Sequence, residues 1–253
     1  MTRYFLTLSY DGSDFNGWQI QENTPNTVQQ VLQEKLSMLF RENVSLTGCG
    51  RTDTGVNARN FVAHFDSRSP ALEKEKVQLL YRINTVLPSS VAVHDLRTVK
   101  DNAHARFDAI QRVYHYHISR RKDPFRDRYT WFVYGDLDFD MMNLAASKLL
   151  QHSDFTSFSK HHTQTKSNIC KVSRAEWTRS SPHEFRFTIV ADRFLRGMVR
   201  SVVGTLVLAG RGKITLSEFD EIINARDRSA AGANAPPHAL FLSGVRYPEN
   251  IYG

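Results

Sequence analysis

Hydrophobic and polar residues alternate from Arg3 to Tyr10, which is the period of a β-strand with one buried face. A helical period follows. Thr27 lies at its predicted start, and Gln30 three residues later has the spacing of a capping box. Apolar residues at i, i+3 and i+4 spacing form one face of this helix: Val28, Val31, Leu32, Leu36, Leu39 and Phe40. The chain therefore begins with a strand, a loop and an amphipathic helix.

The same patterns predict two successive series of elements. In the first series, strands are predicted at Val44 to Gly48, Asn60 to Ser67 and Val91 to Val99, with a helix at Lys74 to Asn84. The second series has strands at Arg112 to Ser119, Lys171 to Arg179, Glu184 to Ala191 and Ala239 to Arg246. Its helices are predicted at Asp140 to Gln151, Gly197 to Ala209 and Leu216 to Asn224, with a loop at Ser229 to His238.

This order of elements predicts an α+β fold with a mainly antiparallel sheet, in two halves that cover residues 1–105 and 106–253. No low-complexity linker separates the halves, and no repeat is visible in the residues themselves. We therefore expect the halves to share a rigid interface with a cleft along it.

The chain has 253 residues and a net charge of +7, from 33 basic and 26 acidic residues. Its hydrophobic content of 41% is that of a globular protein and argues against extensive disorder. The basic excess indicates a polyanionic partner or an anionic substrate without deciding between them.

Cys49 and Cys170 are the only cysteines and form no CxxC pair, which fits a reducing compartment. The N-terminal apolar run is interrupted by Asp11 and Gly12, too early for a signal peptide, and no apolar run approaches membrane-spanning length. The expected location is the cytoplasm.

Common catalytic signatures are missing, including GxSxG, HExxH and GxxxxGK[ST], so a metal or nucleotide enzyme is disfavoured. His161 and His162 are adjacent, but no carboxylate or thiol lies at ligand spacing, and an exposed polar loop is the preferred interpretation. His115 and His117 are expected to pack or to face solvent. The segment from Gly210 to Lys213 lacks phosphate-loop spacing and is interpreted as a helix end.

Basic residues form two clusters that are poor in acidic residues. The first contains Arg106, Arg112, Arg120, Arg121, Lys122, Arg126 and Arg128. The second contains Arg193, Arg196, Arg200, Arg211 and Lys213. Any single cluster is usually a solvated surface, but two of them favour contacts with nucleic-acid phosphates.

The stretch GCGRTDTGV, from Gly48 to Val56, has two interpretations. Asp and Gly are common in tight turns, so Asp53 could belong to a turn and pair with a surface arginine. Alternatively, the glycines let the backbone approach a bound group, and Arg51 or a distant arginine keeps the Asp53 carboxylate ionised. The residue pattern alone leaves both open.

Eight blocks in order resemble the TruA family of tRNA pseudouridine synthases over nearly the whole chain. They are YDGSDFNGWQIQ, TVQQVLQEKL, GCGRTDTGVNA, HARFDA, RVYHYHI, DFTSFSK, FLRGMVRSVVGTL and APPHALFL. The resemblance implies two RRM-like halves joined on a mainly antiparallel sheet with a central active-site cleft. It also implies a homodimer whose subunits both contact one tRNA, and no cofactor.

The resemblance assigns a role to each matching residue. Asp53 is the essential carboxylate, with Arg51 beside it in the motif, and Arg200 is its salt-bridge partner. Arg106 inserts at the target base, and Tyr114 stacks on the target uracil. The substrate-binding residues expected besides Arg106 and Tyr114 are Arg112, Arg120, Arg121, Arg126 and Arg196. Three positions depart from the family pattern, namely Thr54, Val113 and Ala239.

The implied activity is isomerisation of uridine to pseudouridine at positions 38, 39 and 40 of the tRNA anticodon stem-loop. A different or narrower RNA target is one alternative, and an RNA-binding or RNA-folding module is another. The sequence does not separate a covalent route through Asp53 from a glycal-type route.

Overall fold

The computed structural model describes residues 1–22, 24–69, 72, 76–160 and 167–252 and divides the chain into two compact units. One contains Met1–Ile110 with Leu242–Gly253, and the other contains Gln111–Phe241. Residues 106–110, most of the last strand and the residues after it cluster with the first unit, and the expected division into halves after residue 105 stays a prediction. The architecture is mixed α+β, as predicted, and antiparallel strand pairing predominates.

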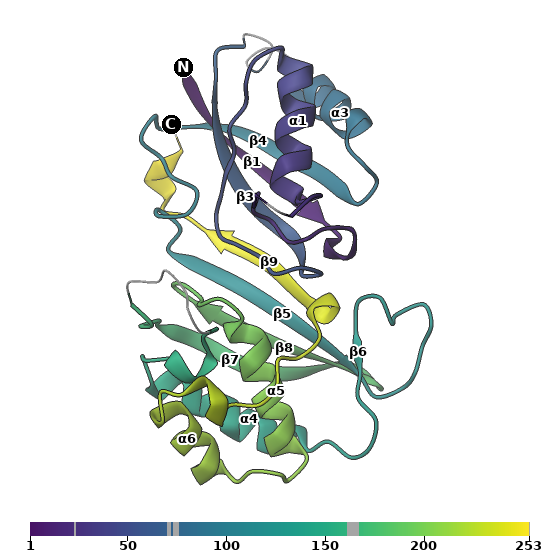
Figure 1. The fold of residues 1–253 in the computed structure, drawn as a ribbon, viewed down its shortest axis with the longest axis vertical. Helices are drawn as coiled ribbons and strands as arrows, with labels where there is room; N and C mark the ends of the chain where they lie inside the picture. Colours follow the sequence, from purple (N-terminus) through teal and green to yellow (C-terminus); the bar gives the residue numbers. More distant parts are fainter. Residues whose placement is uncertain (23, 70–71, 73–75, 161–166, 253) are drawn as a thin grey trace. The chain divides into compact units, whose positions relative to one another are not determined.

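The first unit is a sheet with two helices on one face (Figure 1). Its strands are arranged in the order β4-β1-β3-β9, and β2 pairs with β3. The bounds are β1 Thr2–Tyr10, β2 Thr47–Gly48, β3 Asn57–Ser67, β4 Val91–Val99 and β9 Leu240–Arg246. The helices are α1 Val28–Phe40 and α3 Lys76–Val86, and short 3-10 turns lie at Gly12–Asp14 and Glu249–Ile251.

Alternating side chains of β1 form the core between this sheet and its helices. Leu6 and Leu8 are fully buried, and the ring of Tyr4 stacks on Phe65 of β3 at 5.7 Å. Phe65 in turn stacks on Phe40 of α1 at 6.1 Å between ring centroids. The strand period predicted from the sequence therefore places every second residue against the helices.

The second unit has strand order β5-β8-β7, with β6 parallel to β5 (Figure 1). Its strands are β5 Gln111–Ser119, β6 Trp131–Phe132, β7 Val172–Ser181 and β8 Glu184–Ala191. Its helices are α4 Phe139–Lys148, α5 Met198–Gly210 and α6 Leu216–Asn224. Short 3-10 turns lie at Leu149–Gln151, Thr156–Phe158, Arg228–Ala230 and Pro237–Ala239.

Helix α5 is the centre of the second core, because most of its residues are buried on all sides. It ends at Gly210, and the Lys213 amide donates to the Leu208 carbonyl at 2.9 Å beyond Gly212, which has a φ of 63°. The segment from Gly210 to Lys213 is therefore a helix end, as predicted. Among the described helices, including α5, none has the length and apolar character needed to cross a membrane.

Two local expectations needed correction. The strand expected at Val44 to Gly48 is reduced to Thr47–Gly48. The reason is that two glutamines of α1 bind the backbone of Leu46: Gln33 accepts from its amide at 2.9 Å and Gln29 donates to its carbonyl at 2.8 Å. At the start of α1, Thr27 accepts from the Gln30 amide as expected, but the Gln30 side chain bonds to Glu34, one turn along the helix.

Candidate active site

Asp53 lies at the start of a β-turn between β2 and β3. The Val56 amide donates to the Asp53 carbonyl at 3.1 Å, and Gly55 adopts a φ of 76°, the value that the third position of a type II turn requires. Asp53 is half-buried, whereas Arg51 is exposed. The stretch therefore forms a turn that holds a carboxylate in a fixed loop, and this geometry is compatible with both interpretations of Asp53.

The loop is fixed by contacts with the end of β1 and the segment after it. The Tyr10 hydroxyl and Thr52 Oγ1 are hydrogen-bonded at 2.9 Å, and the Trp18 amide donates to the Thr52 carbonyl at 3.3 Å. The Gly12 amide donates to Asn57 Oδ1 at 2.8 Å. Both flanks of Asp53 are thus tied to residues about forty positions earlier in the chain.

Two glycines of the YDGSDFNGWQIQ block allow this close packing. A Cβ at Gly12 would lie 2.2 Å from the Val56 carbonyl oxygen, and one at Gly17 would lie 2.5 Å from the Thr52 carbonyl oxygen. Such distances are far inside van der Waals contact, so only glycine fits. Sequence analysis assigned no role to these glycines. The sequence carries no signal for this role, because it does not show which backbone atoms the two glycines approach.

Tyr114 lies on β5, directly opposite Ile189 of β8, and is half-buried. Its ring makes an edge contact with the ring of Phe194 at 5.0 Å and 82°. Two residues along the strand, Tyr116 is fully buried, and its hydroxyl donates to the Pro236 carbonyl at 2.9 Å. Phe194, which holds the edge of Tyr114, was not predicted as a site residue.

Arg200 lies in the first turn of α5 and is half-buried. Its Nε donates to the Ala235 carbonyl at 2.7 Å, and the Ala235 amide donates back to the Arg200 carbonyl at 3.0 Å. The neighbouring Pro236 accepts from Tyr116. The APPHALFL block therefore connects the start of α5 to the buried tyrosine of β5.

The predicted site residues divide between the two units. Asp53, Arg51 and Arg106 belong to the first, and Tyr114 and Arg200 belong to the second. The pairing of Arg200 with Asp53 stays a prediction.

The predicted phosphate-binding arginines are not equivalent. Arg121 and Arg196 are exposed. Arg120 donates to the carbonyls of Val133, at 2.7 Å, and Gly135, and therefore also holds the loop after β6. Two others also make contacts within the second unit: Arg112 donates to the Asp192 carbonyl at 2.7 Å, and Arg126 lies 3.4 Å from a carboxylate oxygen of Glu184.

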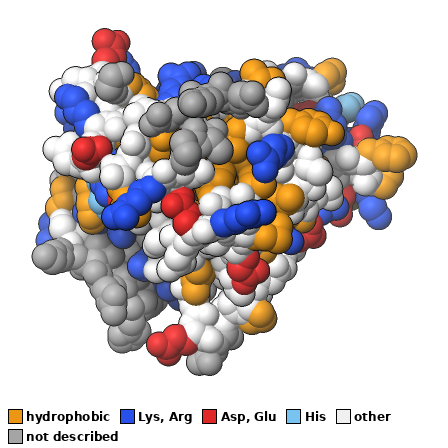
Figure 2. All heavy atoms as spheres, turned by 90° about the horizontal axis from the view of Figure 1, so that it is seen from above, with side chains coloured by type: hydrophobic (Ala, Val, Ile, Leu, Met, Phe, Trp, Pro, Cys, Tyr) orange, Lys and Arg blue, Asp and Glu red, His pale blue; other side chains and the backbone are white. Residues whose placement is uncertain are grey.

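Basic side chains occur across the face shown in Figure 2, with acidic and hydrophobic side chains among them. The surface charge on that face does not single out one RNA-binding patch. Within the part of the chain that the structure describes, no group of three or more potential ligands could hold a metal ion. His161 and His162 lie outside the described residues.

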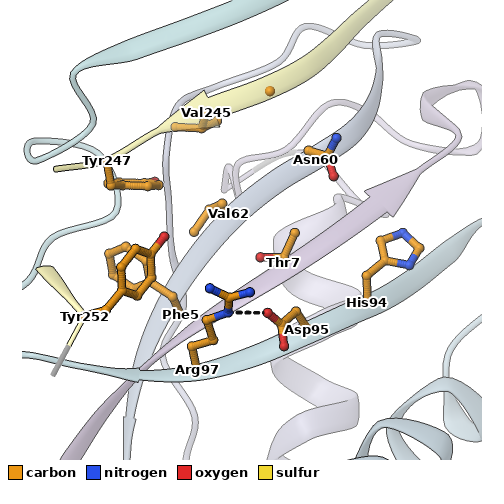
Figure 3. A pocket seen from close by; sticks show the side chains of 11 residues that line it. Phe5, Thr7, Asn60, Val62, His94, Asp95, Arg97, Val245, Tyr247 and Tyr252 are labelled. Atoms are coloured by element: carbon orange, nitrogen blue, oxygen red, sulfur yellow. Dashed lines mark hydrogen bonds and ion pairs between the residues drawn. The ribbon is translucent and has the colours of Figure 1, made fainter. Parts of the chain in front are cut away.

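A pocket of about 460 Å³ opens beside strands β1, β3, β4 and β9 of the first unit (Figure 3). Arg97 bonds to Asp95 at 2.5 Å and lies over the Tyr252 ring at 5.6 Å, while Phe5 and Tyr247 form another wall. None of the predicted site residues lines this pocket, and we assign it no role in the reaction.

The three departures from the family pattern lie in different surroundings. Thr54 is exposed at the tip of the Asp53 turn. Val113 pairs with Val190 on the sheet and is half-buried, and Ala239 is fully buried. None of these side chains replaces one of the residues assigned a chemical role.

Residues 145–248, which include α5 and β9, match the family described as tRNA pseudouridine synthase. The whole chain is 48% identical over 254 residues to tRNA pseudouridine synthase A of Bacteroides thetaiotaomicron, covering 100% of this chain and 93% of that protein. The chain belongs to the tRNA pseudouridine synthase A family.

Other members of the family are similarly close. Identity is 47% over 250 residues to the protein of Bacteroides fragilis, with 99% of this chain and 98% of that protein covered. Identity to the protein of Rhizobium meliloti is 40% over 253 residues, with 98% of this chain and 100% of that protein covered. Both units are therefore included in the similarity, and family membership does not depend on one motif.

Proposed function

We propose that this protein isomerises uridine to pseudouridine at positions 38, 39 and 40 of the tRNA anticodon stem-loop, with the Asp53 carboxylate acting on a flipped uridine. Family membership supports the reaction class. The observation that carries the role of Asp53 is its place on a turn that is tied down on both sides. A preorganised charge avoids reorganisation during the reaction.

The reaction breaks the bond between ribose C1′ and uracil N1, turns the base, and rejoins it through C5. It involves no net oxidation or reduction, so it requires no redox cofactor. An ionised carboxylate can meet the electron deficiency at C1′, either covalently or electrostatically, or it can remove a ribose proton to give a glycal. We propose Asp53 for this step and Arg200 as the cation that keeps it ionised.

The target base must leave the helical stack, and an aromatic side chain that stacks on it recovers part of the lost energy. We propose Tyr114 for this role, with Arg106 inserted at the site that the base leaves. The edge contact from Phe194 supports this proposal, because it fixes the orientation of the Tyr114 ring.

Replacing Tyr114 separates stacking from hydroxyl chemistry. Tyr114→Phe keeps the aromatic face, whereas Tyr114→Ala removes it, and stacking of a base on an aromatic side chain is worth about 1 to 3 kcal/mol. We expect Tyr114→Ala to weaken tRNA binding about 5- to 150-fold and Tyr114→Phe to bind like the wild type. Filter binding under matched salt measures both. Equal affinities for all three proteins would show that Tyr114 is a packing residue.

Binding to tRNA should weaken steeply with salt, because each neutralised phosphate contributes about 0.7 to 0.9 to the slope of log K against log salt. Arg121→Glu is expected to reduce this slope, with a smaller effect on turnover at saturating tRNA. Charge reversal at Arg120 or Arg126 should act in the same direction, although Arg120→Glu also loses its two bonds to the loop after β6.

Arg82→Glu is the matched control for the salt titration, because it makes the same change in net charge at an exposed position on α3, outside both clusters. Its slope should equal that of the wild type. Binding of wild-type protein that does not vary with salt would contradict the polyanion interpretation.

The chain is organised in two halves of similar fold in our proposal. We propose that the N-terminal half, 1–105, is RRM-like and carries the aspartate loop. The C-terminal half, 106–253, is then also RRM-like and carries Tyr114 and the basic helix.

We further propose a cytoplasmic homodimer whose subunits both contact one tRNA. Sedimentation of the pure protein tests the dimer, since a fully active monomer at working concentration would overturn it.

The target positions are tested with three tRNA transcripts, each with a single uridine at position 38, 39 or 40. Mass-spectrometric mapping after incubation with the pure protein should find pseudouridine in all three. Conversion of only one or two would favour the narrower-target alternative, and conversion elsewhere would favour a different RNA site.

A further inference from the structure

The HARF segment after β4 forms a compact turn that carries Arg106 at an exposed position. The Asp108 amide donates to the His104 carbonyl at 3.0 Å, and the His104 amide donates to Asp108 Oδ2 at 2.7 Å. Ala105, immediately before Arg106, is fully buried. Buried Ala105 thus anchors the turn immediately before Arg106, and the two hydrogen bonds between His104 and Asp108 close it.

The His104 ring supports the tip of this turn. Its Nδ1 accepts hydrogen bonds from the backbone amides of Arg106, at 3.1 Å, and Phe107, at 3.2 Å. The rings of His104 and Phe107 lie 4.2 Å apart, and the Arg106 guanidinium lies 5.7 Å from the Phe107 ring centroid. An imidazole nitrogen can accept only while it carries no proton, so these bonds require a neutral His104 with its proton on Nε2.

A second histidine anchors the turn to the sheet. His64 of β3 is 7% exposed, and its Nδ1 accepts from the Ala105 amide at 3.1 Å. The Tyr247 hydroxyl donates to the Ala105 carbonyl at 2.6 Å, so both backbone polar groups of this buried residue are bound by side chains. The rings of His64 and His104 meet edge to face at 4.7 Å.

An ion pair on the same side of the sheet fixes the segment just before the turn. The Arg3 guanidinium donates to both carboxylate oxygens of Asp66 at 2.7 Å, and to the Ala103 carbonyl at 3.0 Å. This bidentate pairing places a permanent positive charge near the two imidazoles. A second positive charge on either ring is therefore disfavoured.

Burial lowers the pKa of His64 to about 4. The nearby His104 and Arg3 lower this pKa further, whereas the carboxylates of Asp66 and Asp108 raise it. Burial also lowers the pKa of His104, with Arg3 and Arg106 adding to the effect and Asp108 opposing it. Both rings are therefore neutral at physiological pH, as their acceptor geometry requires.

We propose that His104 and His64 are positioning residues whose neutral imidazoles hold the turn that presents Arg106 to the RNA, so that acid releases the turn. This inference rests on the proposed role of Arg106. Protonation would place a proton on Nδ1, directly facing the amide protons that it now binds. The stabilisation from His64 is present above the unfolded pKa of about 6.5 and is lost as the pH falls towards about 4.

Two substitutions of His104 separate the acceptor from the rest of the ring. Asn has an oxygen near the position of Nδ1 and does not titrate, whereas Ala has no acceptor. We expect the amides of Arg106 and Phe107 to keep their hydrogen-exchange protection in His104→Asn and to lose it at least about tenfold in His104→Ala, measured by NMR. In the wild type, protection of these two amides should fall as the pH is lowered below about 6.5, the ordinary pKa of histidine, because the pKa of His104 lies below that value. Unchanged protection in His104→Ala would overturn the inference.

Turnover tests the consequence for RNA. At neutral pH, kcat/KM should fall about tenfold in His104→Ala and remain near the wild-type value in His104→Asn. As the pH is lowered, kcat/KM of His104→Asn should decline less steeply than that of the wild type. The exposed His94, which bonds to Ser9 on β1, provides the control, because His94→Ala should change neither measurement.

The outcomes distinguish this inference from the proposed function. Loss of amide protection with unchanged kcat/KM in His104→Ala would overturn the positioning role while pseudouridine formation stands. Failure of the wild-type protein to form pseudouridine would instead count against the proposed function, and the exchange measurement would still report on the turn.

Discussion

Asp53→Asn should abolish pseudouridine formation while tRNA still binds. The substitution keeps the size of the side chain and suits the same turn, but it removes the negative charge needed by either proposed route. We expect turnover to fall by at least about 10³-fold, to below detection in a multiple-turnover assay. Affinity for tRNA should be equal to that of the wild type or slightly higher, because one charge that repels phosphates is lost.

Thermal unfolding of the variant distinguishes loss of chemistry from loss of fold. Asp101→Asn, at an exposed turn position of the same unit, is the matched control and should retain activity. A folded Asp53→Asn protein with turnover near the wild-type rate would reduce Asp53 to a turn residue that pairs with a surface arginine.

Gly12→Ala should inactivate the protein from a position outside the catalytic loop. The added methyl group would lie 2.2 Å from the Val56 carbonyl oxygen and 2.9 Å from the Gly55 carbonyl carbon. Backbone atoms cannot rotate away as a flexible side chain can, so the Asp53 turn must shift. Overpacking of this kind costs about 1 to 3 kcal/mol, or more where backbone is involved. We expect a lower melting temperature and a loss of kcat of about 10²-fold or more, since small displacements of a catalytic group have effects of this size.

Gly50→Ala provides the control within the loop itself. A Cβ at Gly50 meets nothing within 4 Å, and its φ lies outside the left-handed region. The variant should therefore keep the stability of the wild type. If Gly12→Ala were as active as the wild type, the contact between the β1 end and the loop would not be what positions Asp53.

Local periodicity was sufficient to predict most of the fold. Helix α6 has the predicted bounds, Leu216–Asn224, because an amphipathic pattern coincides there with a capping box between Thr215 and Glu218. The strand at Val44 to Gly48 was overestimated because the sequence pattern does not show that glutamine side chains from α1 bind Leu46. Strand β6, only two residues long, has no detectable period.

The candidate site was less accessible to sequence reasoning. Residue chemistry left Asp53 undecided between a turn and an active site, and only the resemblance to a family selected one. The support for the loop comes from Gly12 and Gly17, and the Arg106 turn depends on His64, about forty residues away in the chain. Such residues matter because of what they touch in three dimensions, and a single sequence carries no signal for these contacts.

The most direct test of the central claim is product analysis with the wild-type protein. An unmodified tRNA transcript with uridines in the anticodon stem-loop is incubated with pure protein, digested, and analysed by mass spectrometry for pseudouridine. An isomerase should convert the stem-loop uridines in amounts that exceed the amount of protein, without added cofactor. A protein that binds the transcript tightly but leaves every uridine unchanged would be an RNA-binding module, and that result would contradict the proposed isomerase activity.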